Sequence, residues 1–215
     1  MNNKSIKYEL QNILSGKSGG SYDATIQAIT CYLRTSQRTG PVAEEKHKNK
    51  AKEKKKLINF ATQNNLFFDV ILSENYISEG AEQKVYMKDA QSVIKLNDAI
   101  YYASWEDYFH NLLLHNYFFS DTTYHLLGFY ILKDILYAVV SQNFIKADSL
   151  TKLHQVKAFL NANGFINTKN NDYYQPELGI ILEDLHDENV LTHKGMLYFI
   201  DTVFYVKPEI FWQSS

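Results

Sequence analysis

Short strand-like segments follow one another directly from Phe67 onward, and they restrict the fold. They are rich in Val, Ile and Tyr and are separated by turn residues rather than by helices. The predicted strands are residues 68–77, 84–88, 91–96, 128–132 and 135–142. A single helical pattern, which begins at Trp105, interrupts them. This order predicts an α+β fold with a five-stranded antiparallel sheet, and it argues against the alternating order of a Rossmann or P-loop fold.

The regions on either side of this predicted sheet differ in character. Before it, apolar residues at helical spacing predict helices over 5–14, 22–35 and 44–63, with Ser21 or Asp23 as the cap of the second. After it, we expect a helix over 150–160 and a hairpin that turns at His193-Lys194-Gly195. The chain is therefore divided into a helical extension (1–66), a first lobe (67–145) and a smaller second lobe (146–215).

Composition excludes several classes of protein. A net charge of −2 argues against a generally basic nucleic-acid binder, and the single Cys31 allows neither an internal disulfide nor a multi-cysteine zinc site. The sequence contains neither an apolar run of membrane-spanning length nor the apolar core of a signal peptide, so we expect a cytoplasmic protein. Lys46–Lys56 holds seven Lys and one Glu. This run is expected to be a solvated helix face, with nucleic-acid or acidic-partner binding as the less favoured interpretation.

Acidic and amide side chains gather between residues 183 and 201. Glu183, Asp184, Asp187, Glu188 and Asn189 lie in a loop between apolar runs, and Asp201 follows the predicted hairpin. Carboxylates this dense repel one another unless cations neutralise them. Because oxygen ligands of this kind favour hard ions such as Mg²⁺, and the hairpin can bring Asn189 and Asp201 together, we expect a magnesium site here.

The spacing of Asp184, Asn189 and Asp201 resembles the catalytic and metal-binding loops of the protein-kinase-like fold. The form Asp-Leu-His-x-x-Asn-Val-Leu is similar to the aminoglycoside and small-molecule kinase branch. This resemblance implies that Asp184 accepts or orients the substrate hydroxyl and that Asn189 and Asp201 bind Mg²⁺.

Upstream residues match the same pattern in the same order. Ser78–Tyr86 resembles a phosphate-covering hairpin with one glycine, so Gly80, Ala81, Glu82 and Gln83 are expected to contact the phosphates. Ser92-Val93-Ile94-Lys95-Leu96 is similar to the strand that carries the phosphate-binding lysine. The resemblance makes Glu106, with Asp107 as the alternative, the helix carboxylate that pairs with Lys95. The adenine is expected against Gln142-Asn143-Phe144-Ile145, with Gln142 and Phe144 as contacts.

Further motifs resemble one bacterial family, the kinase domain of polyvalent proteins carried by phages and conjugative elements. They are Trp105-Glu106-x-Tyr108, Leu113-x-His115-Asn116-x-Phe118, Gly128-Phe129 and residues 182–191. The resemblance covers about residues 55–210 and implies a two-lobed, protein-kinase-like fold that binds ATP and Mg²⁺. It implies a phosphotransferase whose hydroxyl acceptor, protein or small molecule, is unknown.

The sequence also departs from the kinase pattern. Leu182-Glu183 replaces the usual His-Arg or His-Gly, Thr202-Val203 follows Asp201 in place of Phe-Gly, and 14 residues after Asp201 indicate a truncated second lobe. Three alternatives therefore stay open. The chain could be a nucleotide-binding pseudokinase, a hydrolase with a metal site at His186, Asp187 and Asp201, or a protein that binds partners through its basic helical region.

Overall fold

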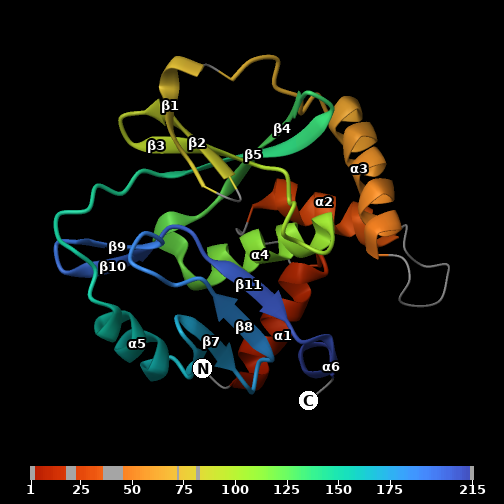
Figure 1. The fold of residues 1–215 in the computed structure, drawn as a ribbon. Coiled ribbons are helices and arrows are strands. Elements are labelled where there is room, and N and C mark those ends of the chain that lie inside the picture. The colour runs from red at the N-terminus through yellow and green to blue at the C-terminus, as the bar shows by residue number, and fades with distance from the viewer. Residues whose placement is uncertain (1–2, 18–22, 36–45, 72, 81–82, 214–215) are drawn as a thin grey trace.

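The computed structural model describes residues 3–17, 23–35, 46–71, 73–80 and 83–213 (Figure 1). Its helices are α1 Asn3–Leu14, α2 Ala24–Thr35, α3 Lys46–Gln63, α4 Trp105–Phe118, α5 Leu153–Ala162 and α6 Pro208–Phe211. The strands of the first lobe are β1 Tyr76–Glu79, β2 Gln83–Asp89, β3 Ser92–Asn97, β4 His125–Leu132 and β5 Ile135–Asn143. Those of the second lobe are β6 Ile166–Lys169, β7 Asp172–Gln175, β8 Ile180–Glu183, β9 Val190–His193, β10 Met196–Phe199 and β11 Val203–Val206.

The first lobe is a five-stranded sheet in the order β1-β2-β3-β5-β4, with every neighbouring pair antiparallel. This confirms the predicted α+β class and its antiparallel sheet. Lys133 and Asp134, both with positive φ, form the tight turn between β4 and β5.

One predicted strand is wrong. Within residues 68–77 only the last two belong to a strand, β1. The segment before them crosses the edge of the sheet at β4: Phe67 forms one parallel bridge with Phe129, and the amide of Phe68 donates to the carbonyl of Phe129 at 2.8 Å. Val70, which is 65% exposed, then lies outside the core. Apolar residues alone therefore gave a false strand where the chain only passes over the sheet.

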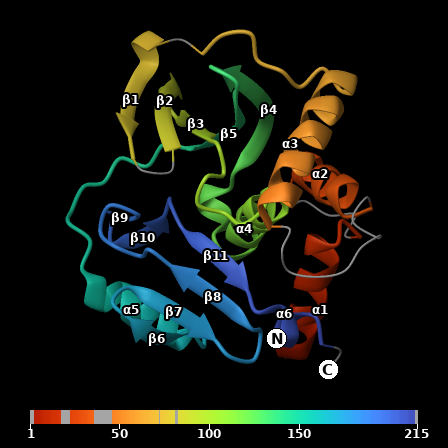
Figure 2. The same ribbon diagram turned by 45° about the vertical axis from the view of Figure 1, so that its right-hand side comes forward.

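The three N-terminal helices pack against α4, with α3 beside the five-stranded sheet and α1 beside α6 (Figures 1 and 2). Asp23 caps α2 by accepting from the amides of Thr25 and Ile26 at 3.0 Å each, as predicted for one of two candidates; the other, Ser21, lies outside the described residues. Leu10, Ile29 and Leu57 belong to the same hydrophobic core as the α4 side chains. The division of the chain after residue 66 stays a prediction, but it does not coincide with a break in this core. Of the helices in the described ranges, none has the length and apolar composition that a membrane span needs.

Helix α4 is the centre of the molecule. Ser104 caps it by accepting from the amide of Asp107 at 3.0 Å, and all residues from Tyr108 to Asn116 are buried. Buried polar side chains need hydrogen-bond partners. Asn111 and His115 bond to Phe204 and Thr202, and Asn116 bonds to the backbone of Tyr124, so α4 joins the residues that lead into β4 to those around the start of β11.

The second lobe contains the four-stranded antiparallel sheet β11-β8-β7-β6, the separate hairpin β9–β10, and α5. The predicted hairpin is confirmed, with Lys194 and Gly195 at positive φ in its turn. Three elements were not predicted: the β6–β7 hairpin, strand β11 and helix α6. The first of these lies in a polar segment in which only Tyr173 and Gln175, both in β7, are buried, so it lacks the apolar alternation that predicts a strand.

Candidate functional site

A cavity of about 360 Å³ lies where the five-stranded sheet faces the β9–β10 hairpin and the strand end before β11. The β1–β2 hairpin, β3, the end of β5 and the 188–191 segment all contribute to its wall. Most of the predicted site residues line it, namely Gly80, Gln83, Lys95, Gln142, Phe144, Asn189 and Asp201. The structure therefore brings together side chains that are separated by more than a hundred positions in the sequence.

Lys95 is the buried cation of this cavity, with 4% of its surface exposed. Its Nζ donates to the carbonyl oxygen of Ile200 at 2.7 Å and lies 3.5 Å from the hydroxyl of Tyr124. Burial lowers the pKa of Lys95, and the charge of Asp201 opposes that shift. A buried ammonium group has lost its hydration, so binding an anionic ligand beside it would be favourable.

Asp201 is held in place through its chain neighbours. The hydroxyl of Thr122 donates to the carbonyl of Phe199 at 2.6 Å, and the hydroxyl of Tyr124 donates to the carbonyl of Ile200 at 2.8 Å. On the other side, the hydroxyl of Thr202 lies 2.7 Å from Nδ1 of His115. The segment that carries Asp201 is thus fixed by α4 and by the residues that lead into β4.

The tautomer of His115 follows from its partners. Its Nε2 lies 2.9 Å from the carbonyl of Thr122, which can only accept, so Nε2 carries the hydrogen. Nδ1 then accepts from Thr202. Burial is the main cause that lowers the pKa of His115 to about 3, with the charge of Lys95 acting in the same direction, so the ring is neutral. His115 and Asn116 therefore support the core through buried hydrogen bonds.

The loop between β8 and β9 forms a second polar group. The side-chain nitrogen of Asn189 donates to the backbone carbonyl of Asp184 at 2.8 Å and to its carboxylate at 2.9 Å. His186 Nε2 lies 3.1 Å from the same nitrogen and 3.3 Å from the Asp184 carboxylate. Asp184 has a φ of 65°, and its amide bonds to the carboxylate of Asp172 at 3.2 Å. Its carboxylate is therefore oriented by Asn189 while its side chain stays 54% exposed.

Asp201 also contacts the β1–β2 hairpin, because the side-chain nitrogen of Gln83 donates to its carboxylate. Of the four residues predicted for this hairpin, Gly80 and Gln83 line the cavity, whereas Ala81 and Glu82 lie outside the described residues. Glu79 and Glu188 line the cavity as well, although neither was assigned a ligand: Glu188 was predicted only as a member of the acidic loop and Glu79 only as part of the 78–86 hairpin. Nothing in their spacing distinguishes them from solvated loop residues.

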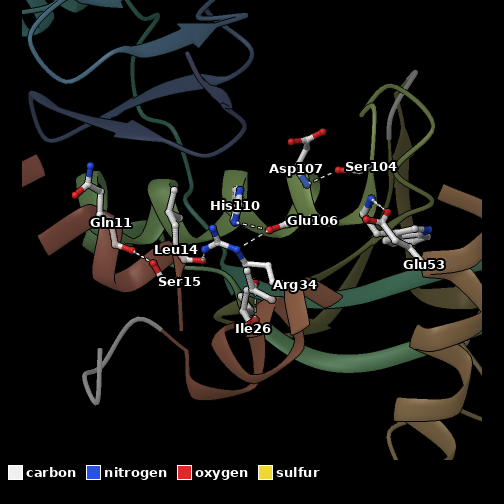
Figure 3. Close-up of polar contacts among 12 residues, drawn as sticks. Gln11, Leu14, Ser15, Ile26, Arg34, Glu53, Ser104, Glu106, Asp107 and His110 are labelled. Carbon is white, nitrogen blue, oxygen red and sulfur yellow. Dashed lines mark hydrogen bonds and ion pairs between the residues drawn. The ribbon is translucent and has the colours of Figure 1, made fainter. Parts of the chain in front are cut away.

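Glu106 has different partners from the one predicted. Its carboxylate lies 3.2 Å from Nε of Arg34 and 3.6 Å from Nε2 of His110, on the face of α4 that meets α2 (Figure 3). The residue of α4 that approaches the Lys95 environment is His115, whose ring packs on Tyr124 at 4.6 Å. At 1.5 Å per residue, His115 lies about 13 Å along the helix from Glu106. The predicted ion pair between Lys95 and Glu106 is therefore wrong. Asp107, the alternative, donates its backbone amide to the side chain of Ser104, and its side chain points away from Arg34 in Figure 3.

The lysine run is used in part for packing. Lys50 donates to the backbone carbonyls of Ala99, Ile100 and Tyr102, and Lys54 donates to that of Asp134. The side chains of residues 46–49 lie outside the described part of the chain. Lys52 and Lys55 are exposed, in agreement with a solvated face.

The hydrolase alternative finds no support in the ranges that the structure describes. In these ranges no cluster of three or more His, Cys, Asp and Glu side chains could hold a metal ion. His186 contacts Asp184 and Asn189 rather than forming a set with Asp187 and Asp201.

Comparison with known proteins adds one finding. A family model described as serine/threonine/tyrosine kinase found in polyvalent proteins matches residues 50–208. The match begins within α3 and ends at the start of α6, so it includes β1 to β11 and every described residue of the cavity wall. Neither the comparison with curated proteins nor that with solved structures gave a match.

Proposed function

This chain belongs to the family of serine/threonine/tyrosine kinases found in polyvalent proteins, and on that premise we propose that it is an ATP- and Mg²⁺-dependent phosphotransferase. It would transfer the γ-phosphoryl group to a hydroxyl acceptor. The observation that carries the proposal is the cavity in which Lys95 of β3 meets Asn189 and Asp201, which flank the distant β9–β10 hairpin. Phosphoryl transfer depends mainly on positioning and on electrostatic stabilisation, which is what such a set can supply.

The residues that line the cavity match the chemical groups of a nucleotide. Val85, Val93 and Leu191 give it apolar walls suited to a purine ring, next to the Gln142–Ile145 connector. Lys95 would bind the phosphates, and Gly80 and Gln83 would cover them. These two residues lie close together, since the amide of Gly80 donates to the carbonyl of Gln83 at 2.9 Å.

The residues present are compatible with Mg²⁺. Asn189 uses its amide nitrogen on Asp184, so its amide oxygen is the atom that would face a cation, together with the carboxylate of Asp201. One or two carboxylates plus substrate phosphates and water are the usual shell of this ion. When bound, the ion would neutralise charge on the phosphates.

Asp184 is proposed to orient the acceptor. Its carboxylate is fixed by Asn189 and its side chain is open to solvent, so an incoming hydroxyl could donate to it. The hydroxyl oxygen would then form a bond to the γ-phosphorus while the bond to the β-γ bridging oxygen breaks. ADP leaves, and the acceptor's proton passes to Asp184.

A second candidate is a nucleotide-binding module without turnover. It is favoured by one observation: the α4 carboxylate expected on Lys95 pairs with Arg34 instead. The two candidates share the binding site and differ only in transfer.

Thermal unfolding with ATP plus Mg²⁺, followed by transfer of labelled γ-phosphate, tests both. Wild type should be stabilised by saturating nucleotide and Asp201→Ala should be stabilised less, whereas Asp187→Ala, an exposed change in the loop between β8 and β9, should respond like wild type. Stabilisation with no transfer to the chain itself or to Ser, Thr and Tyr peptides would favour the inactive module. If the wild type shows neither stabilisation by nucleotide nor transfer of phosphate, the proposal is contradicted.

A further inference from the structure

Lys95 has to be held by something other than the α4 carboxylate. A buried ammonium group requires acceptors, and the contacts of Lys95 are the carbonyl of Ile200 at 2.7 Å and the hydroxyl of Tyr124 at 3.5 Å. Its Nζ also lies 5.3 Å from the centre of the Tyr124 ring, within the range of a cation–π contact. Tyr124 therefore meets Lys95 with both its hydroxyl and its ring.

The hydroxyl of Tyr124 links Lys95 to the segment of Asp201. It donates its hydrogen to the carbonyl of Ile200 at 2.8 Å, so its oxygen can accept from the ammonium group and from the side chain of Gln142, its other hydrogen-bond partner. The same carbonyl accepts from Lys95 and belongs to the residue directly before Asp201. Burial raises the pKa of Tyr124 well above its ordinary value, so the phenol keeps the hydrogen that it donates.

Tyr124 is itself rigidly placed. The side chain of Asn116 accepts from the amide of Tyr124 at 2.7 Å and donates to its carbonyl at 2.8 Å, which clamps the backbone to α4. The ring packs on His115, which is bonded to Thr202 on the far side of Asp201. The placement of the hydroxyl is thus decided by the core rather than by solvent.

We propose that Tyr124 is the positioning residue for Lys95, holding the ammonium group beside Asp201 where it can meet a triphosphate. The inference rests on the proposed function, because it gives Tyr124 a part in nucleotide binding. It also explains how the site can work although Glu106 pairs with Arg34.

A double-mutant cycle tests this role. ATP affinity is measured in EDTA, so that metal ligands do not contribute, for wild type, Tyr124→Phe, Lys95→Met and the double variant. Tyr124→Phe removes only the hydroxyl, whose contact with Nζ at 3.5 Å is a long hydrogen bond, so we expect a loss of ATP affinity of about twofold to tenfold. Because Tyr124 acts through the amine, the same substitution should cause no further loss once Lys95 is Met.

Tyr130→Phe is the matched control, since Tyr130 lies on the adjoining strand β4 in the smaller apolar cluster around Leu96. It should bind ATP as wild type does. If Tyr124→Phe does not fold, Tyr124→Met repeats the cycle with a side chain that adapts to the space. The positioning role would be overturned if the losses of ATP affinity in the two single variants added up in the double variant, or if Tyr124→Phe bound ATP as tightly as wild type. Either result would leave the proposed function unaffected. Failure of wild type to bind ATP even with Mg²⁺ would overturn both.

Discussion

The carboxylate of Glu53 accepts a hydrogen bond from the backbone amide of Trp105 at 2.8 Å. Glu53 is the one acidic residue in the lysine run of α3, and Trp105 is the first residue of α4 (Figure 3). An acceptor at this end of α4 satisfies an amide that has no partner within the helix. The lysine-rich helix is thereby attached to the helix that organises the candidate site.

Glu53 should make the stability of the chain depend on pH. Burial is the main cause that raises its pKa from 4.5 to about 7, and the charges of Glu106 and Asp107 add to the shift. Between these two pH values the folded chain keeps a proton that the unfolded chain releases, so the free energy of unfolding should fall as pH rises through this window. At about 1.4 kcal/mol per pKa unit, the loss is on the order of 3 kcal/mol.

Glu53→Gln keeps an acceptor for the Trp105 amide but carries no charge. Denaturant unfolding at pH 5 and pH 8 should show a larger gain over wild type at pH 8 than at pH 5. Glu209→Gln, an exposed change in α6, should give no such difference. Equal gains at both pH values would mean that Glu53 does not titrate in this range.

Lys50 and Lys52 should differ in their effect on stability although they are two residues apart. Lys50 donates to three backbone carbonyls of the loop before α4, whereas Lys52 is exposed. Lys50→Met should lower the free energy of unfolding by about 1 kcal/mol, and Lys52→Met by less than about 0.5 kcal/mol. Equal effects would contradict the packing role, and salt-sensitive DNA binding lost in Lys52→Met would favour the nucleic-acid interpretation.

Much of the site could be predicted because its residues follow local signals. Lys95 stands between apolar neighbours in a strand, and Asn189 and Asp201 flank a hairpin whose turn has Gly195 in the left-handed region. A hairpin fixes which residues face each other, so the sequence was sufficient to bring these two together.

The partner of Glu106 could not be predicted in the same way. Its contact with Arg34 depends on how α4 is placed against α2, and α4 is buried on so many sides that its apolar pattern does not select one face. Tyr124 carries no signal at all in the sequence, since its role depends on the clamp by Asn116 eight residues earlier.

Gly128 should not tolerate a side chain. Its φ is 151°, and an added Cβ would lie 2.1 Å from the carbonyl oxygen of Leu66, which is backbone and cannot turn away. That oxygen accepts from the amide of Phe129 at 2.7 Å, so Gly128→Ala would push the chain after α3 away from β4. We expect a loss of more than about 3 kcal/mol in the free energy of unfolding.

Gly80→Ala is the comparison for stability, because an added Cβ there meets nothing within 4 Å. In denaturant unfolding, Gly128→Ala should lose several times as much free energy of unfolding as Gly80→Ala. A loss for Gly128→Ala as small as that for Gly80→Ala would show that the segment around Leu66 can shift without cost.

Asp184→Asn separates binding from transfer. Asparagine tolerates the left-handed backbone that Asp184 adopts at a φ of 65°, so the loop should keep its fold. Its amide cannot take the proton of an acceptor hydroxyl, and loss of such a group lowers rates by about a hundredfold to ten-thousandfold. Single-turnover transfer of labelled γ-phosphate should therefore slow to this extent, while thermal stabilisation by ATP plus Mg²⁺ stays at the wild-type level. Asp187→Asn, three residues along and exposed, should leave both measurements unchanged, and an equally slow Asp187 variant would point to a general effect of charge in the loop rather than to a proton acceptor at Asp184.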